Sequence, residues 1–134
     1  MIFVDAVAWI YIYDSSQPAD QRDRALSVIK RAKERFCTSD LIIAETHKWL
    51  THHGRSLSRS SEILTVLAKE QVANILEVQA SDRILAAALV AKYLDQKLSY
   101  ADALSVALMR RHHIQKILSF DKHFLLFKDI TRVP

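Results

Sequence analysis

Four carboxylates hold comparable places in the sequence, although long stretches of chain separate them: Asp5, Glu45, Asp102 and Asp121. Asp5 and Asp121 each follow a short apolar run, whereas Asp102 and Glu45 lie early in predicted helices. A helix-capping or helix-dipole role would explain any one of these acids taken alone. Four converging carboxylates would repel one another unless a divalent cation neutralised them. The four acids are therefore either separate structural residues or one site for a hard cation.

The elements that must position these acids are short apolar strands that alternate with helices. Strands are predicted over residues 2–4, 36–38, 72–78, 114–120 and 130–133. Helices are predicted over residues 6–13, 19–36, 41–53, 56–70, 82–95, 101–112 and 121–127. Such alternation predicts an α/β fold with a short, mostly parallel central sheet and a helix-rich periphery. In an open parallel sheet, strand ends and helix starts share one edge, where the acids could meet.

Several residues mark where these helices begin or end. Ser39 or Asp40, Ser81 or Asp82, and Ser99 are the expected N-caps of three helices. Gly54 is expected to be the C′ residue that follows the helix over 41–53.

Composition narrows the classes of function. The 134 residues fit one domain, and Gly54 is the only glycine, which excludes the glycine-rich nucleotide-binding loops. A lone Cys37 excludes an internal disulfide and a cysteine zinc cluster. The sequence has no secretory signal and no apolar run approaching a membrane span of about 18 residues. We therefore expect no membrane association and a cytoplasmic location.

The basic residues are unevenly distributed. The whole net charge of +4 lies in residues 103–134, which hold six Lys and Arg against two Asp. A basic segment of this kind could bind a polyanion, or it could be an ordinary solvated surface.

Three segments resemble a known family. They read MIFVDAVAWIYIYD, TSDLIIAETHKWL and LSYADALSVALMRRHHIQKILSFDKHF, and they resemble the PIN-domain ribonucleases, most closely the VapC-type toxins of toxin–antitoxin pairs. The resemblance runs from residue 2 to about residue 125, with the four acids in the order and spacing of the family. It implies a single PIN-like domain over residues 1–134, with a three-layer α/β/α fold.

The resemblance also implies a function, which is metal-dependent endoribonuclease activity as the toxin of a type II toxin–antitoxin pair. Asp5, Glu45, Asp102 and Asp121 would then be the catalytic and metal-binding residues, and Ser119 would match a Ser or Thr that orients the site. A carboxylate cluster without cysteine or paired histidine suits Mg²⁺ or Mn²⁺ better than zinc. The implied partners are an RNA substrate and a VapB-like antitoxin, and we expect a homodimer.

One departure from the family leaves alternatives open. The family usually has a hydroxyl residue one or two positions after the first Asp, where this chain has Ala6 and Val7. Ser15 or Ser16 could replace that donor; otherwise Asp5 would be less firmly oriented. The alternatives are a catalytically weak PIN-like module that binds RNA or protein, and a flavodoxin-like or receiver-like module in which the acids are only caps.

Basic and aromatic residues are the remaining candidates for contacts with RNA. Four basic residues are expected to contact phosphate: Arg110, Arg111, Lys116 and Lys122. His123 could also reach phosphate. The tryptophans, Trp9 and Trp49, lie in helical apolar patterns and are expected in the core or an interface rather than stacked on bases.

Overall fold

A single parallel sheet lies at the centre of the computed structural model, which describes residues 1–54 and 56–134. Its strands are β1 (Ile2–Val4), β2 (Phe36–Thr38), β3 (Asn74–Ile75), β4 (Lys116–Leu118) and β5 (Thr131–Val133). They lie in the order β3-β2-β1-β4-β5, and every neighbouring pair is parallel. The carboxyl ends of all five strands therefore meet at one edge of the sheet.

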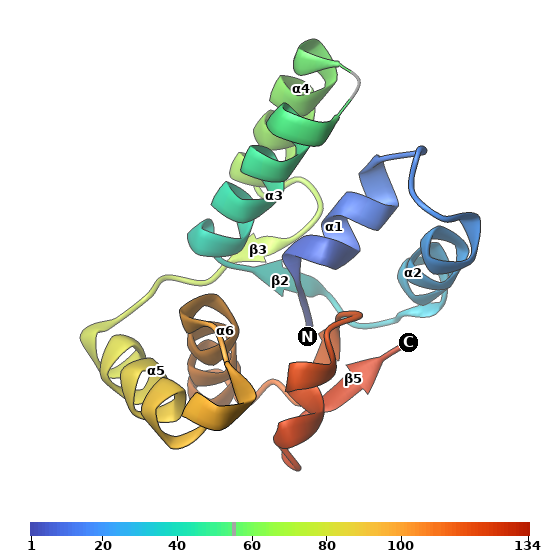
Figure 1. Ribbon diagram of the computed structural model, residues 1–134. Coiled ribbons are helices and arrows are strands. Elements are labelled where there is room, and N and C mark those ends of the chain that lie inside the picture. The colour runs from blue at the N-terminus through green and yellow to red at the C-terminus, as the bar shows by residue number, and fades with distance from the viewer. Residues whose placement is uncertain (55) are drawn as a thin grey trace.

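The helices form two groups around this sheet (Figure 1). They are α1 (Ala6–Tyr13), α2 (Ala19–Arg31), α3 (Asp40–His53), α4 (Leu57–Ala68), α5 (Ala80–Lys92), α6 (Tyr100–Arg111) and the short 3₁₀ helices η1 (Leu94–Gln96) and η2 (Lys122–Leu126). α1 packs on α2 and α3, and α3 packs along α4, whereas α5 packs along α6.

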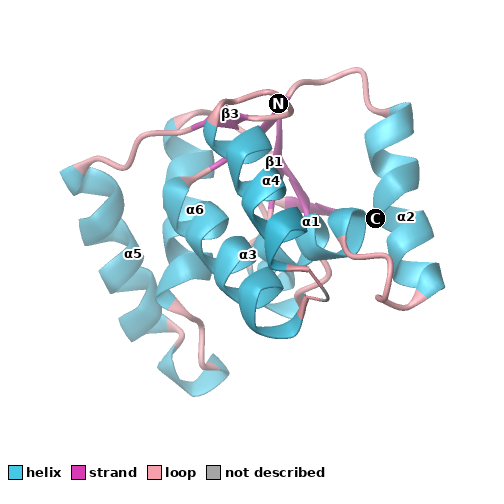
Figure 2. Cartoon of the chain, turned by 90° about the horizontal axis from the view of Figure 1, so that it is seen from above, coloured by secondary structure: helices cyan, strands magenta, loops and turns pink. Residues whose placement is uncertain are grey.

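The order of the strands explains why these two groups lie on opposite faces. The chain moves outward from β1 to β3 and then crosses back to β4, so right-handed crossovers place α1–α4 on one face and α5–α6 on the other. Figure 2 shows α2 and α5 at opposite ends of the molecule. The expected three-layer α/β/α fold is confirmed. None of the helices that the structure describes is both long and apolar enough to cross a bilayer.

The central strands β1 and β4 and the helix α6 supply much of the core. Phe3, Val4, Ile117 and Leu118 are all completely buried. Every residue of α6 from Ala101 to Met109 is buried as well, because α5 covers its outer side. A helix buried on all sides holds its first turn rigidly, and Asp102 lies in that turn.

Most predicted boundaries agree with the structure. The side chains of Ser39 and Ser99 cap α3 and α6 by accepting hydrogen bonds from backbone N–H groups. β1 and α1 have the predicted ranges, and β5 is an edge strand.

Several elements differ from the prediction, and α4 and β4 are shorter at both ends than expected. α2 ends at Arg31 rather than Phe36, because Ala32 takes an extended conformation and the chain turns into β2. α5 is capped by Gln79 in a capping box with Asp82, not by Ser81 or Asp82 itself. β3 has only two residues. Gly54 is extended, with φ −70°, and is not the left-handed residue expected after α3.

Candidate functional site

Asp5 begins the site at the carboxyl end of the central strand β1. It is the N-cap residue of α1, but its side chain makes no capping hydrogen bond. Instead, the hydroxyl of the fully buried Ser119 donates a hydrogen bond to Oδ2 of Asp5 at 2.8 Å. The same Ser119 Oγ accepts a hydrogen bond from the backbone N–H of Asp121 at 3.0 Å. Ser119 therefore links the acids that follow β1 and β4.

Asp102 reaches the site from the first turn of α6. Ser99 supplies the cap of this helix, since its Oγ accepts a hydrogen bond from the backbone N–H of Asp102 at 3.1 Å. The carboxylate of Asp102 is therefore not needed as a cap, although the residue is buried. Burying a carboxylate is costly unless another group compensates its charge.

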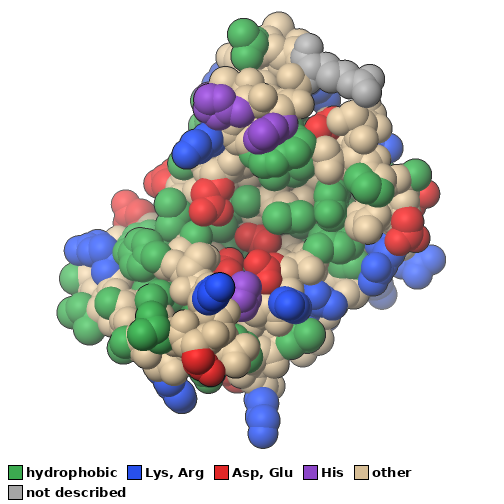
Figure 3. Space-filling view, in the orientation of Figure 1, with side chains coloured by type: hydrophobic (Ala, Val, Ile, Leu, Met, Phe, Trp, Pro, Cys, Tyr) green, Lys and Arg blue, Asp and Glu red, His purple; other side chains and the backbone are tan. Residues whose placement is uncertain are grey.

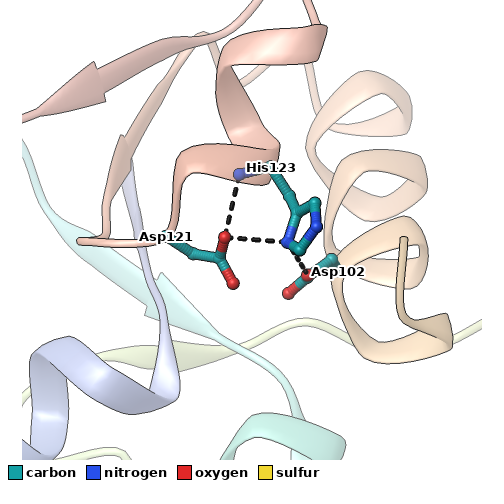
Figure 4. A group of neighbouring side chains, drawn as sticks. All are labelled: Asp102, Asp121 and His123. Atoms are coloured by element: carbon teal, nitrogen blue, oxygen red, sulfur yellow. Dashed lines mark hydrogen bonds and ion pairs between the residues drawn. The ribbon is translucent and has the colours of Figure 1, made fainter. Parts of the chain in front are cut away.

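Asp121 and His123 complete a compact group with Asp102 (Figure 4). Asp121 caps η2 by accepting a hydrogen bond from the backbone N–H of His123 at 2.8 Å. The ring Nδ1 of His123 lies 2.9 Å from Oδ1 of Asp121 and 3.7 Å from Oδ2 of Asp102. One ligand atom from each of the three residues lies within 4.8 Å of the others. This spacing would allow one cation to contact all three.

Glu45 lies on the exposed surface of α3, about one turn from its start. The pKa of its carboxyl is raised, first by partial removal from water and second by the charge of Asp5. The effect of the Asp5 charge on this pKa means that Glu45 lies within electrostatic reach of Asp5. Figure 3 shows acidic side chains in a hollow of this face, with a histidine and basic side chains beside them.

The pKa values of the two buried acids, Asp5 and Asp102, also reflect their burial and the charges of neighbouring carboxylates. The pKa of Asp5 is raised, chiefly by burial and also by the charge of Asp121, although the Ser119 hydrogen bond opposes the shift. Burial, together with the charges of Asp5 and Asp121, raises the pKa of Asp102 to about 7. The ion pair with His123 opposes that shift only weakly. A bound divalent cation would relieve this repulsion, and a cluster of oxygen donors suits such a cation.

The helix-cap interpretation accounts for only one of the four acids. Asp121 caps η2, whereas neither Asp5 nor Asp102 makes a side-chain capping bond and Glu45 lies inside α3. The structure thus groups Asp102 with Asp121, links Asp5 to Asp121 through Ser119 and leaves Glu45 within electrostatic reach of Asp5, and capping does not explain this arrangement.

Three of the four basic residues expected to contact RNA lie away from these acids. Arg110 and Arg111 are at the C-terminal end of α6, opposite Asp102, and Lys116 begins β4 at the other edge of the sheet. Each pairs with an acid: Arg110 with Asp129, Arg111 with the buried Asp82, and Lys116 with Glu34. Their place in the fold and these ion pairs argue against the RNA-contact interpretation for all three. Lys122 is exposed next to Asp121 and remains a candidate.

Among the described residues, neither Ser15 nor Ser16 makes a hydrogen bond to Asp5 that would replace the donor absent at Ala6 and Val7. Ser16 uses its hydroxyl on Asp14, at 2.6 Å, so it does not serve Asp5. Ser119, which the family pattern already includes, donates to Asp5. Asp5 is therefore oriented without the absent donor, and RNA cleavage by the wild-type protein tests the weak-module alternative.

The aromatic residues divide between core and surface. Trp9 is buried and its indole N–H donates to Thr38, as a core residue would. Trp49 is half-buried on α3, where it lines a hollow of about 630 Å³ together with Glu45, Lys48, His52 and His53. This hollow adjoins the acidic group through Glu45.

His123 and Gln96 are the site residues that sequence reasoning missed as neighbours of the acids. The ring Nε2 of His123 lies 2.9 Å from the backbone carbonyl of Gln96 in η1. The only signal in the sequence is that His123 follows Asp121 by two residues. Because Asp121 caps the 3₁₀ helix η2, this spacing brings the ring of His123 back beside the carboxylate.

Known proteins share the sequence pattern and the fold of this chain. A family model of the PIN domain matches residues 2–130. The structure of Mycobacterium tuberculosis VapC20, described as a toxin that cleaves the sarcin-ricin loop, superposes with a TM-score of 0.85 and 22% identity over the whole of both chains. The structure of Neisseria gonorrhoeae FitAcB superposes with a TM-score of 0.70 and 12% identity. The match covers 100% of this chain and 97% of that one. At these identities the likeness shows a shared fold. Comparison with curated proteins gives no significant match.

Proposed function

The chain belongs to the PIN domain family, and we propose that it is a metal-dependent endoribonuclease, the toxin of a type II toxin–antitoxin pair. The observation that carries the proposal is the group of Asp102 and Asp121 beside Asp5, with mutual charge effects that extend to Glu45 and raised pKa values for Asp5, Glu45 and Asp102. Fold likeness to a toxin described as cleaving the sarcin-ricin loop supports RNA as the substrate class.

The donor set fits Mg²⁺ or Mn²⁺. A bound divalent ion supplies charge neutralisation at phosphorus and a water acidic enough to act near neutral pH. Asp5 and Asp102 are the proposed ligands of the first ion, and Asp121 completes the set. Ser119 holds Asp5 in place, which keeps the distances between the donors fixed.

Glu45 has the chemistry of a proton acceptor at the exposed rim of the site. Its raised pKa makes its carboxylate a better base than an ordinary surface glutamate. We propose that it accepts a proton from the attacking water or completes the ligand set. One-ion and two-ion mechanisms are both compatible with this arrangement.

Cleavage of RNA tests the proposal directly. The wild-type protein with Mg²⁺ or Mn²⁺ should cut a single-stranded RNA, EDTA should abolish cutting, and Asp102→Asn should do the same. Ser105→Ala is the matched control, since Ser105 is buried in α6 and its hydroxyl serves only the carbonyl of Ala101 among the described residues. Equal cleavage by the Asn variant would refute the catalytic assignment, and no cleavage by any variant would refute the nuclease.

An antitoxin is the proposed protein partner. A toxin of this kind must be held inactive, so expression alone should be poorly tolerated, and a VapB-like antitoxin should restore growth. Asp102→Asn should relieve the toxicity but still bind the antitoxin, because the amide keeps the shape of the carboxylate. The homodimer and the cytoplasmic location stay predictions, which light scattering and cell fractionation test.

A further inference from the structure

His123 has a fixed orientation in the site. A carbonyl oxygen can only accept a hydrogen bond, so the 2.9 Å contact to Gln96 requires that Nε2 of His123 carry a proton. In a neutral ring, Nδ1 then presents its lone pair. That atom is shielded from solvent, and no described residue has hydrogen-bond geometry towards it.

The free Nδ1 faces two carboxylate oxygens. Oδ1 of Asp121 and Oδ2 of Asp102 lie 2.9 and 3.7 Å away. A nitrogen lone pair held this close to two anionic oxygens is unfavourable unless a cation lies among them. Metal-binding histidines typically have this arrangement, with the second ring nitrogen donating to a carbonyl that fixes the ring.

We propose that Nδ1 of His123 is a ligand of the catalytic ion, together with Asp102 and Asp121, and that Gln96 holds the ring through its backbone carbonyl. The inference rests on the proposed function, because it concerns the ion of the same site. A set with one imidazole nitrogen is softer than carboxylates alone. It favours Mn²⁺ over Mg²⁺, since Mg²⁺ prefers oxygen donors throughout.

Three variants distinguish a His123 that binds the metal ion from a His123 that only lies near it. His123→Gln keeps a donor for the Gln96 carbonyl but has no nitrogen at the Nδ1 position. His123→Asn places an amide oxygen close to that position. His52→Gln is the control, because His52 is an exposed histidine further along α3. Melting in EDTA checks that each variant folds.

Pulsed electron paramagnetic resonance of bound Mn²⁺ and calorimetric titrations with each metal give readouts that need no RNA. Wild type and His52→Gln should show ¹⁴N coupling to Mn²⁺, and His123→Gln should lose it. The affinity of His123→Gln for Mn²⁺ should fall at least about tenfold, and its affinity for Mg²⁺ by less. His123→Asn should retain Mg²⁺ affinity and lose the preference for Mn²⁺.

Opposite outcomes overturn the inference. They are absence of ¹⁴N coupling in wild type, persistence of the coupling in His123→Gln, or equal losses of affinity for both metals. A rise in Mn²⁺ affinity in His123→Gln would identify the ring as a positively charged counter-ion of the acids. Nitrogen-coupled Mn²⁺ in a protein that cuts no RNA would refute the nuclease and leave the ligand assignment standing.

Discussion

The hydroxyl of Ser119 donates a hydrogen bond to Oδ2 of Asp5 at 2.8 Å, and the two residues are 114 positions apart in the chain. Ser119 follows β4 and Asp5 follows β1, which pair side by side at the centre of the sheet. Because Ser119 also receives the backbone N–H of Asp121, one side chain orients two of the four acids.

Replacing Ser119 with alanine should weaken metal binding. The lost hydrogen bond stabilises the charged form of Asp5, so the pKa of Asp5 should rise further above its ordinary value. A carboxylate that is less firmly held should bind Mn²⁺ roughly tenfold more weakly, as measured by calorimetry at pH 7.5. Ser105→Ala removes another buried hydroxyl and should leave Mn²⁺ affinity unchanged. Equal affinities in the two variants would mean that Ser119 does not orient the site.

Asp102→Asn should stabilise the metal-free protein at high pH. The pKa of Asp102 is raised to about 7 in the folded state against 3.8 for an ordinary aspartate. The folded state therefore binds more protons between these values, so stability falls as pH rises from about 4 to about 7. In EDTA at pH 8 the variant should melt a few degrees above wild type, and at pH 5 the difference should shrink.

Bound metal should reverse the order of the melting temperatures of wild type and Asp102→Asn. Millimolar Mn²⁺ should raise the melting temperature of wild type by mass action and that of Asp102→Asn much less. If the variant melts lower than wild type in EDTA at pH 8, and metal has no effect on either, Asp102 is a structural residue of the helix end.

Arg111→Ala should destabilise the fold without changing RNA binding. Arg111 contacts Asp82, whose side chain is 2% exposed. Burial is the largest single influence and would raise the pKa of Asp82, but the hydrogen bonds from Arg111 and the backbone of Gln79, with the charge of Arg111, together outweigh it, so the pKa is lowered. Removing Arg111 should lower the melting temperature by several degrees, because it leaves the buried carboxylate of Asp82 without its ion-pair partner.

The neighbouring Arg110 gives the matched control for this prediction. Its ion pair with Asp129 is exposed on both sides, and Arg110→Ala should cost less than about 1 kcal/mol. A small effect of Arg111→Ala together with weaker RNA binding would restore the phosphate-contact interpretation.

Lys122→Ala should reduce RNA affinity and its dependence on salt. Lys122 is exposed beside Asp121, where a phosphate backbone crossing the site would pass. Loss of one phosphate contact should lower the slope of log affinity against log salt by about one unit. Lys116→Ala, at the opposite edge of the sheet, should leave the slope unchanged. Indistinguishable slopes for the two variants would exclude Lys122 as a contact.

The positions of the acids could be predicted because local patterns determine them. Asp5 directly follows β1, Asp121 lies a few residues after β4 and begins η2, and Ser99 starts the helix that carries Asp102. Parallel strands with short connections then leave one edge where these ends can meet.

The ion pairs of the basic residues could not be predicted, because their partners are distant in the chain. Arg111 pairs with an acid 29 residues away and Lys116 with one 82 residues away. Only the packing of α5 on α6 brings Asp82 to Arg111. His123 was missed as a neighbour of Asp102 for the same reason.

The pairing of β1 with β4 also sets the order of events during synthesis. Asp5 is made early, but the groups that orient it and complete the donor set, Ser119 and Asp121, are made more than a hundred residues later. Contacts of such long range form late in folding. A nascent chain that lacks β4 has no assembled acid cluster, so the site becomes complete only after Ser119 and Asp121 have been made and β4 has paired with β1.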